Sequence, residues 1–352
     1  MAAALPTHPR RKPMTRLRCL VVLGLAVLRG GPAVRAERDQ PRPPNFVFVY
    51  TDDQRWDALG VVQREQAEKA RFPWFRSPNM DRLAAEGVRF RNAFVVNSLC
   101  APSRATFLTG LYGDRNGIVS NHTPFPEDNV THARLLKQAG YTTGYIGKWH
   151  MGSQRGQRPG FDFSASFIGQ GRYVDCPFDV DGRETPTTGW VDDVSTDFAL
   201  RFLRENRERP FLLVVGFKAT HGPCDPPARF RTTYEGETAR AVPNLDQPAI
   251  YAPGAGTKPV AAREPGPVPV NLNYFRCLTA ADENLGRILN ALDELKLADD
   301  TVVVFASDNG FYFGEHRLAD KRSDYDESLR VPMIVRYPKL VRRGQVLDAM
   351  VL

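Results

Sequence analysis

The sequence predicts an α/β protein in which a mainly parallel β-sheet is sandwiched between helices. Short runs of apolar, β-branched and aromatic residues recur along the chain, without the polar alternation of a sheet that faces water. Between these runs lie stretches whose apolar residues recur at helical spacing. Strands that are apolar on both faces and alternate with helices are typical of a parallel sheet covered on both sides.

The expected elements follow one another from residue 45 onward. The strands are Asn45–Thr51, Thr142–Ile146, Phe211–Phe217, Thr301–Ala306 and Pro332–Tyr337. The amphipathic helices are Asn79–Glu86, Val130–Ala139, Ser195–Glu208 and Phe275–Leu295. Residues 222–272 are rich in Pro and Gly and lack periodicity, so we expect a long irregular insertion there. Long loops in compact domains are more often functional than idle.

The first 36 residues have the layout of a secretory signal peptide. Five basic residues between positions 10 and 18 precede an apolar run from Cys19 to Leu28, and Ala33-Val34-Arg35-Ala36 follows as a cleavage site. The run is too short to span a bilayer, although a membrane anchor is the alternative. We therefore expect a signal peptide at 1–36, a polar leader at 37–44 and the main domain at 45–352.

Bulk charge gives no support to nucleic-acid binding. The chain has 47 Lys and Arg against 40 Asp and Glu, and residues 1–36 contain seven of the basic residues and no acidic one. The remainder is formally neutral. Its cysteines, Cys100, Cys176, Cys224 and Cys277, are too scattered for a disulfide scaffold, and no CxxC spacing indicates a structural zinc.

Polar side chains follow four of the predicted strands. In chain order they are Asp52 and Asp53, then Lys148 and His150, then Lys218 and His221, then Asp308 and Asn309. Because ligands of open α/β sheets bind beyond the carboxyl ends of the strands, we expect these groups to converge at one edge.

The carboxylates and the amide of this set are hard oxygen donors. Neighbouring carboxylates raise each other's pKa unless a cation lies between them, and an all-oxygen set suits Ca²⁺ or Mg²⁺ rather than zinc. The structural alternatives are a helix cap at Asp52 and a turn at Asp308-Asn309-Gly310. The occurrence of both pairs at strand ends favours a metal site. Cys224 beside His221 offers a second set of ligand types, but a soft thiolate would not suit a calcium site.

The segment Cys100–Gly110 (CAPSRATFLTG) is the most specific motif of the chain. Its structural alternative is a buried cysteine before a helix start, with Arg104 in a surface salt bridge. The segment resembles the C-x-P-S-R-x4-T-G signature of the type I sulfatases, whose cysteine is converted to formylglycine before folding. The blocks that also resemble this family are Asp52-Asp53-Gln54, Gly147–His150, His221, Ser307–Gly310, Lys321 and Arg330–Pro332, so the similarity covers roughly residues 45–340.

The resemblance implies an alkaline-phosphatase-like fold, a catalytic role for residues 45–352 and a set of site residues. The implied calcium ligands are Asp52, Asp53, Asp308, Asn309 and the modified Cys100. The groups implied to hold the sulfate and stabilise charge are Arg104, Lys148 and Lys321. One hydroxyl of the hydrated formylglycine would attack sulfur, His221 with Lys321 would assist the departing alcohol, and His150 would act as base when sulfate is released. A formylglycine-generating maturation enzyme is the implied partner.

The resemblance thus predicts hydrolysis of a sulfate ester, and the likeness of Gly310–Pro338 to glycosaminoglycan-type sulfatases points to a sulfated carbohydrate. One alternative is a phosphonate or phosphate monoester hydrolase of the same fold. A second is a catalytically inactive remnant, because family members continue past Leu352 into a smaller antiparallel sheet that we expect to be absent or truncated here. With its signal peptide, the protein is expected to be secreted or periplasmic, or lysosomal in a eukaryote, with no membrane span after signal removal.

Overall fold

The computed structural model describes residues 42–252 and 266–352. The predicted signal peptide and residues 37–41 of the polar leader lie outside the described residues, as do residues 253–265 of the predicted insertion. Within the described ranges, no helix is long and apolar enough to cross a membrane.

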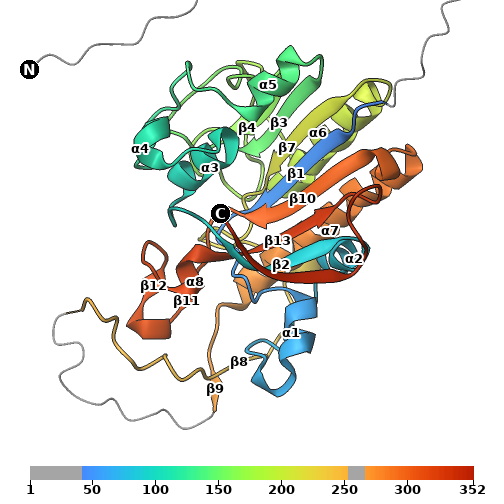
Figure 1. Cartoon of the computed structure of the whole chain (residues 1–352). Coiled ribbons are helices and arrows are strands. Elements are labelled where there is room, and N and C mark those ends of the chain that lie inside the picture. The colour runs from blue at the N-terminus through green and yellow to red at the C-terminus, as the bar shows by residue number, and fades with distance from the viewer. Residues whose placement is uncertain (1–41, 253–265) are drawn as a thin grey trace, which may run out of the picture. The chain divides into compact units, whose positions relative to one another are not determined.

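The described chain is built around a ten-stranded sheet with the order β14-β2-β13-β10-β1-β7-β3-β4-β5-β6 (Figure 1). The strands are β1 (Asn45–Thr51), β2 (Val88–Phe94), β3 (Thr142–Lys148), β4 (Phe163–Phe167), β5 (Phe178–Val180), β6 (Arg183–Thr185), β7 (Phe211–Gly216), β10 (Thr301–Ser307), β13 (Arg330–Arg336) and β14 (Gln345–Val351). The central run β10-β1-β7-β3-β4 is parallel, and β13 pairs antiparallel with β10 and β2. The predicted mainly parallel α/β sheet is confirmed.

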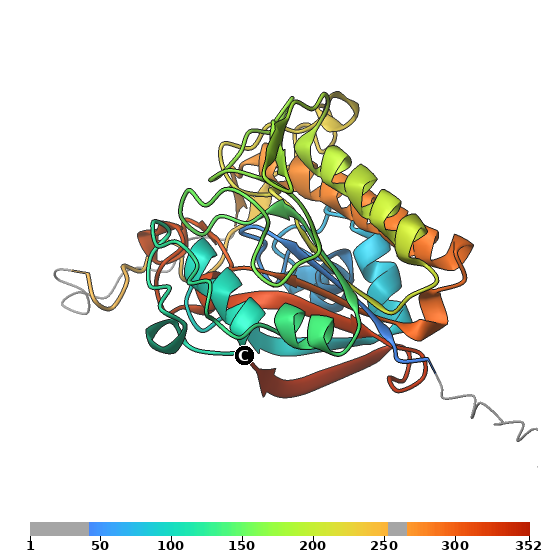
Figure 2. The same cartoon turned by 90° about the horizontal axis from the view of Figure 1, so that it is seen from above.

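Helices cover both faces of the sheet, with α2, α6 and α7 on one side and α3 and α5 on the other (Figure 2). The helices are α1 (Gly60–Gln66), α2 (Pro78–Glu86), α3 (Cys100–Thr109), α4 (Gly113–Asn116), α5 (His132–Gln138), α6 (Val191–Asn206), α7 (Leu272–Glu294) and α8 (Asp326–Leu329). Successive residues of a strand point to opposite faces. Accordingly Val47 and Val49 join the core under α2, α6 and α7, whereas Tyr50 joins the core under α3 and α5.

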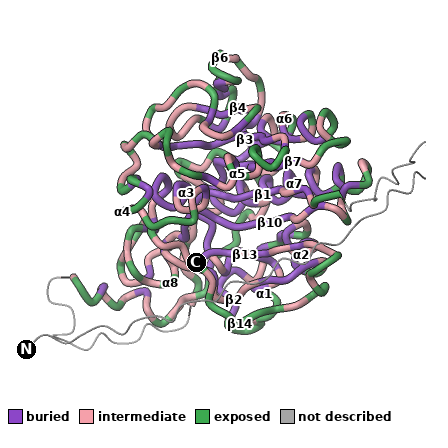
Figure 3. Tube along the Cα trace, turned by 45° about the horizontal axis from the view of Figure 1, so that its top comes forward, coloured by how far each residue is buried: buried purple, intermediate pink, exposed green. Residues whose placement is uncertain are grey.

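The central strands are buried on both faces, as their continuous apolar sequences require (Figure 3). Every residue of β7 is buried, whereas β14 is exposed along most of its length. The middle of the sheet is therefore closely packed on both sides, and its strands position the loops at their carboxyl ends.

The predicted insertion is largely irregular in its described part. Its elements are the short 3₁₀ helix η2 (Ala228–Phe230) and the two-residue strands β8 (Ala239–Arg240) and β9 (Pro267–Val268), which pair antiparallel. A second small hairpin, β11 (Tyr312–Phe313) with β12 (Ala319–Asp320), follows the end of β10. Asn271 caps the following helix α7, because its side chain accepts a hydrogen bond from Asn273 N.

Candidate active site

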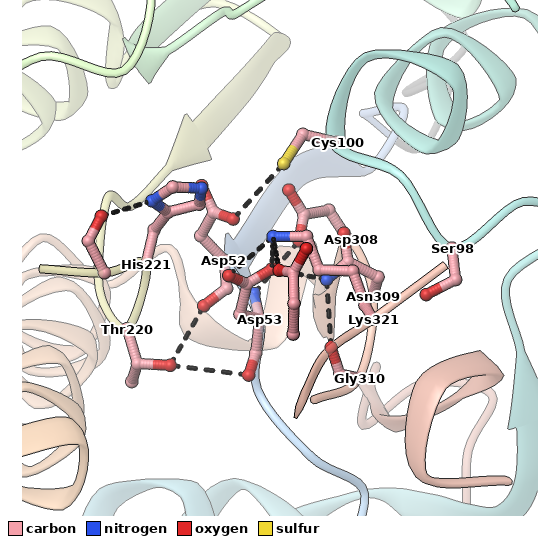
Figure 4. A network of polar contacts seen from close by, with 12 residues as sticks. Asp52, Asp53, Ser98, Cys100, Thr220, His221, Asp308, Asn309, Gly310 and Lys321 are labelled. Atoms are coloured by element: carbon pink, nitrogen blue, oxygen red, sulfur yellow. Dashed lines mark hydrogen bonds and ion pairs between the residues drawn. The ribbon is translucent and has the colours of Figure 1, made fainter. Parts of the chain in front are cut away.

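The carboxyl ends of β1, β3, β7 and β10 meet at one edge of the sheet, as the sequence predicted. Thr51 pairs with Ser307 in the parallel register of β1 and β10, so the residues that follow these two strands start side by side. Figure 4 shows the side chains of Asp52, Asp53 and Asp308 turned toward one another, with Cys100 and His221 beside them. The other predicted site residues lie at the same edge, because Arg104, Lys148, Asn309 and Lys321 each contact one of these carboxylates. His150 follows the last residue of β3 by two positions.

Three buried carboxylates form the centre of the cluster. Asp52, Asp53 and Asp308 each contribute an oxygen, and these atoms all lie within 4.8 Å of one another. Burial and the charge of Asp52 raise the pKa of Asp308 to about 6, and burial also raises the pKa of Asp53. Asn309 Nδ2 donates a hydrogen bond to Asp53 Oδ1 (2.5 Å), whereas Asn309 Oδ1 is buried without a hydrogen-bond partner.

Cys100 is the first residue of α3, and its side chain is fully buried. Its Sγ lies 3.7 Å from Asp52 Oδ1. Burial and the Asp52 carboxylate raise the pKa of the thiol. The preceding turn is held in place because Ser98 Oγ donates a hydrogen bond to Ser328 O (2.8 Å), and Asn121 Oδ1 accepts the N–H of Ala101 (2.9 Å).

Arg104 lies one turn further along α3, with its guanidinium group between two of the carboxylates. Its Nε donates to Asp308 Oδ2 (2.9 Å), and a terminal nitrogen lies 3.2 Å from Asp52 Oδ2. The other terminal nitrogen donates to the carbonyl oxygen of Lys148 (2.5 Å), and the guanidinium lies over the ring of Tyr50. The predicted alternative of a surface salt bridge is therefore wrong, because this side chain is fully buried.

Two lysines complete the ring of cations. Lys148 Nζ forms an ion pair with Asp52 and lies 3.9 Å from Cys100 Sγ. Lys321 Nζ lies 2.6 and 2.7 Å from the two oxygens of Asp53. Burial alone would raise the pKa of Asp52, but the attraction of Lys148, His221 and Arg104 outweighs it and holds this pKa well below its usual range.

The two predicted histidines occupy different environments. His150 is buried, has a left-handed backbone (φ 50°), and its Nδ1 has no hydrogen-bond partner. Burial and the nearby Lys148 lower its pKa to about 2. A ring nitrogen of His221 lies within 4.8 Å of ligand atoms of Asp52 and Cys100. Burial lowers the pKa of His221 to about 4, although the Asp52 carboxylate raises it.

The tautomer of His221 follows from its neighbour. His221 Nδ1 lies 2.7 Å from Gly222 O, and a carbonyl oxygen can only accept a hydrogen bond. Nδ1 therefore carries the proton, which leaves Nε2 of the neutral ring as the free acceptor.

Several supporting residues were not predicted. Thr220 donates from its backbone N–H (2.6 Å) and its hydroxyl (3.1 Å) to the carbonyl oxygen of Asp52, and so fixes the turn after β1. Tyr50 and Tyr145 share a short hydrogen bond (2.5 Å) beneath Arg104. Lys218, which the strand-end pattern singled out, instead donates to Gln170 O (2.9 Å) and lies over the ring of Tyr173.

The α/β sheet and the polar cluster at its carboxyl edge together define an alkaline-phosphatase-like hydrolase. The chain belongs to the sulfatase family, whose model, described as Sulfatase, matches residues 44–350. Members of this family are sulfuric ester hydrolases, as the names of its relatives state. The predicted family, fold and enzyme class are confirmed.

Two relatives are similar over most of the chain. An N-acetylglucosamine-6-O-sulfatase of Bacteroides thetaiotaomicron is 31% identical, and the match covers 94% of this chain and 69% of the relative. An ulvan-active sulfatase of Formosa agariphila is 32% identical, with 88% of this chain and 59% of the relative covered. The chain thus spans about 60 to 70% of the length of these relatives.

Solved structures support the same assignment. A protein bound to its substrate D-glucosamine-2-N,6-O-disulfate has a TM-score of 0.75 and 30% identity, and the match covers 88% of this chain and 74% of that one. A phosphonate monoester hydrolase of Agrobacterium radiobacter has a TM-score of 0.62 and 23% identity, with 87% and 70% of the two chains covered. The second likeness concerns the fold alone.

Proposed function

We propose that this protein hydrolyses a sulfate ester on a carbohydrate, with a nucleophile made from Cys100 and a bound calcium ion. The observation that carries the proposal is the position of Cys100 at the start of α3, 3.7 Å from Asp52 and beside Lys148, among buried acidic and basic groups. The carbohydrate is supported by relatives named as sulfatases of N-acetylglucosamine and ulvan. 6-O-sulfated N-acetylglucosamine is therefore the first substrate to test.

The donor set fits a hard divalent cation. Three carboxylates converge within 4.8 Å, and the buried Asn309 Oδ1 lacks a partner, which an ion would provide. Oxygen-only ligands of this kind suit Ca²⁺, with Mg²⁺ as the alternative. The residues that would hold the ion are Asp52, Asp53, Asp308, Asn309 and the modified Cys100. The bound ion would polarise a sulfuryl oxygen and lower the pKa of a coordinated hydroxyl.

The Cys100 thiol itself is not suited to the reaction. A thiolate is the reactive form of cysteine, and burial beside Asp52 raises the pKa of this thiol. Formylglycine at this position would supply a hydrated aldehyde with two hydroxyl groups on one carbon. We therefore propose that a formylglycine-generating enzyme is a partner during maturation, and that the protein is exported to a secreted, periplasmic or lysosomal compartment.

The three cations are positioned to hold the anionic group of the ester. Arg104, Lys148 and Lys321 each contact a carboxylate of the cluster, so their orientation is fixed before substrate binds. Preorganised cations stabilise charge that is redistributed in a transition state, because little reorganisation is needed during the reaction.

The histidines would handle protons. The lowered pKa keeps His150 neutral and its Nδ1 has no partner in the protein, so the ring is available to take up a proton during release of sulfate once a bound anion favours its charged form. His221 and Lys321 would stabilise the oxygen of the departing alcohol. Burial disfavours the charged form of His221, so the protonated ring needs a negatively charged group beside it. The negative charge that develops on the leaving oxygen would be that group.

The mass of the peptide that contains residue 100, measured on protein from its native host, tests the proposal first. Formylglycine at this position supports it, and an unmodified cysteine in a host that matures other sulfatases would favour the inactive remnant. Turnover of N-acetylglucosamine 6-sulfate against the 6-phosphate then separates the sulfatase from the phosphate or phosphonate ester hydrolase. The sulfate ester should be the better substrate.

A further inference from the structure

Glu315 is a buried residue outside the catalytic cluster, in the segment between β11 and β12. We propose that Glu315 is a positioning residue: it anchors the β11–β12 hairpin, so that Lys321 is held against Asp53 before the substrate binds. This inference rests on the proposed function, because it concerns the lysine assigned there to the sulfate and to the departing alcohol. Glu315 would act through Lys321 and not on the substrate itself.

The carboxylate of Glu315 is bound by two arginines and by its own hairpin. Arg55 Nη1 donates to Glu315 Oε1 (2.7 Å), and Arg71 forms an ion pair with the same oxygen. Glu315 Oε2 accepts the N–H of Phe313 (2.7 Å), a residue of β11. At most 3% of each of the three charged side chains is exposed, so water and salt screen these ion pairs little.

Arg55 connects this ion cluster to the segment that carries Asp53, which it follows by two residues. Its Nε and Nη2 donate to the two oxygens of Asp57 (2.7 and 2.9 Å), and this bidentate pairing fixes the plane of the guanidinium. Its backbone N–H donates to the hydroxyl of Tyr274 (3.0 Å), and that hydroxyl donates to Asp53 O (2.8 Å). Arg55 is therefore held at both its backbone and its side chain.

The two arginines also bind the main chain of the hairpin. Arg55 Nη1 donates to the carbonyl oxygen of Phe311 (2.9 Å), and Arg71 Nη2 donates to that of Phe313 (3.0 Å). These contacts hold β11, which pairs antiparallel with β12. Because Lys321 is the residue directly after β12, the position of its main chain follows from the contacts on β11.

Asp53 and Lys321 are thus connected to the same ion cluster from two directions. Asp53 is connected through Arg55 in its own segment, and Lys321 through the hairpin and Glu315. A lysine side chain has many rotamers, so accurate placement of its backbone helps to keep the ammonium group within 2.7 Å of both oxygens of Asp53 (Figure 4). A cation fixed in this way is preorganised for the transition state.

Glu86 provides a matched control at the other end of the sheet. Its carboxylate also lies between two arginines, with Arg82 Nε 2.9 Å from one oxygen and Arg336 Nε 2.8 Å from the other. Arg336 ends β13, which runs antiparallel to β10, so this carboxylate lies near the amino ends of the parallel strands. Loss of either charge should lower stability, but only the loss at Glu315 should affect Lys321.

Kinetics of the exported, formylglycine-containing protein test the role of Glu315. Glu315→Gln keeps the shape of the side chain and removes its charge. We expect kcat/KM to fall by about 10- to 100-fold for a sugar sulfate and much less for an aryl sulfate, because a poor leaving group depends more on the cation beside its oxygen. Glu86→Gln should leave both values unchanged. Equal losses on the two substrates in Glu315→Gln would indicate a smaller folded fraction only, and would overturn the proposal.

A double-mutant cycle shows whether the effect passes through Lys321. In the Lys321→Met background, Glu315→Gln should change kcat/KM by less than about threefold, because the lysine that it positions is already absent. Additive losses would mean that Glu315 acts independently of Lys321, contrary to the proposal. If Glu315→Gln does not fold, Glu315→Asp, which keeps the charge but shortens the side chain, takes its place in the same cycle with the same expectation.

Crystal structures of the variants give a readout that does not depend on activity. In Glu315→Gln we expect Lys321 Nζ to leave Asp53 or to lose a single defined position, whereas Glu86→Gln should keep the contact. An unchanged Lys321 in Glu315→Gln would refute the positioning role. A wild type that hydrolyses no sulfate ester would instead contradict the proposed function and leave this structural comparison in place.

Discussion

Lys321 Nζ lies within 2.7 Å of both carboxylate oxygens of Asp53, a residue 268 positions earlier in the chain. Asp53 follows the central strand β1, whereas Lys321 follows the small hairpin after β10. The pair therefore joins the segment after β1 to the segment after β12. Lys321 also neutralises Asp53, whose charged form is disfavoured by burial.

Replacing this lysine should impair catalysis more than folding. We expect Lys321→Met to lower kcat/KM for a sulfate ester by about 100- to 1,000-fold, because one preorganised cation at the reacting group is lost. The control is Lys339→Met, whose ion pair with Asp300 is exposed on the surface and should leave kcat/KM unchanged. A loss of less than about threefold in Lys321→Met, with the fold intact, would contradict the assigned role.

Removal of calcium should lower both activity and stability. A chelator is expected to abolish turnover, and calcium at about 100 times its Kd should restore about 2.7 kcal/mol to the free energy of unfolding, since the ion binds only the folded site. Asp308→Asn should lose most of this calcium-dependent stabilisation, measured by thermal unfolding with and without the ion. Asp326→Asn, which removes an exposed carboxylate of α8, should retain it.

The role of His221 can be tested with leaving groups of different basicity. We expect His221→Ala to lower kcat for a sugar sulfate by about 100-fold or more, because an alkoxide needs a proton or a positive partner as it departs. An aryl sulfate, whose phenolate leaves easily, should be affected much less. Equal losses on both substrates would instead place His221 in a step before the sulfur–oxygen bond breaks.

Asp192 should make stability fall as pH rises. This residue of α6 is fully buried, its carboxyl accepts the N–H groups of Lys218 and Ala219 (2.8 and 2.9 Å), and burial raises its pKa from 3.8 to about 7. The folded state therefore retains a proton that the unfolded chain has released. The resulting stabilisation is complete below about pH 4 and is lost as pH rises through about 7.

Urea unfolding at several pH values measures this effect. Between about pH 4 and 7 the wild type should lose on the order of 2–4 kcal/mol more than Asp192→Asn, which cannot ionise. Glu205→Gln, which removes an exposed charge on the same helix, should follow the wild type. Parallel pH curves for wild type and Asp192→Asn would show that Asp192 stays ionised in the folded state.

The strands that the sequence predicted include the most deeply buried strand, β7, but the buried strand β4 was not predicted. β1, β7 and β10 are continuous apolar runs, so their type and bounds could be recognised without the fold. β2 was not predicted because Arg89 and Arg91 interrupt its apolar pattern. Arg89 is nevertheless buried and ion-paired with Glu65, and this long-range contact leaves no local signal in the sequence.

The residues of the candidate site also fall into those that the local sequence indicates and those that it does not. Most of the residues that were predicted either follow apolar strands, as Asp52 and Asp308 do, or belong to the Cys100 motif. Lys321 was predicted from the family resemblance alone. Thr220 and Asn121 were missed because each has an ordinary sequence context and acquires its role from a distant partner, 168 and 20 residues away respectively. A sequence thus indicates which groups carry the chemistry more readily than which groups hold them in place.

The central position of β1 has a consequence for the order of events during synthesis. β1 is among the first elements to emerge from the ribosome, yet its neighbour β10 lies 256 residues further along the chain. At about 5–20 residues per second, roughly 10–40 s separate the emergence of Cys100 from that of Asp308. During this interval the sheet cannot close over Cys100, so a maturation enzyme would meet its substrate as a nascent chain. The maturation enzyme would then reach Cys100 because the strand order of the sheet delays its closure, and not through an opening in the folded protein.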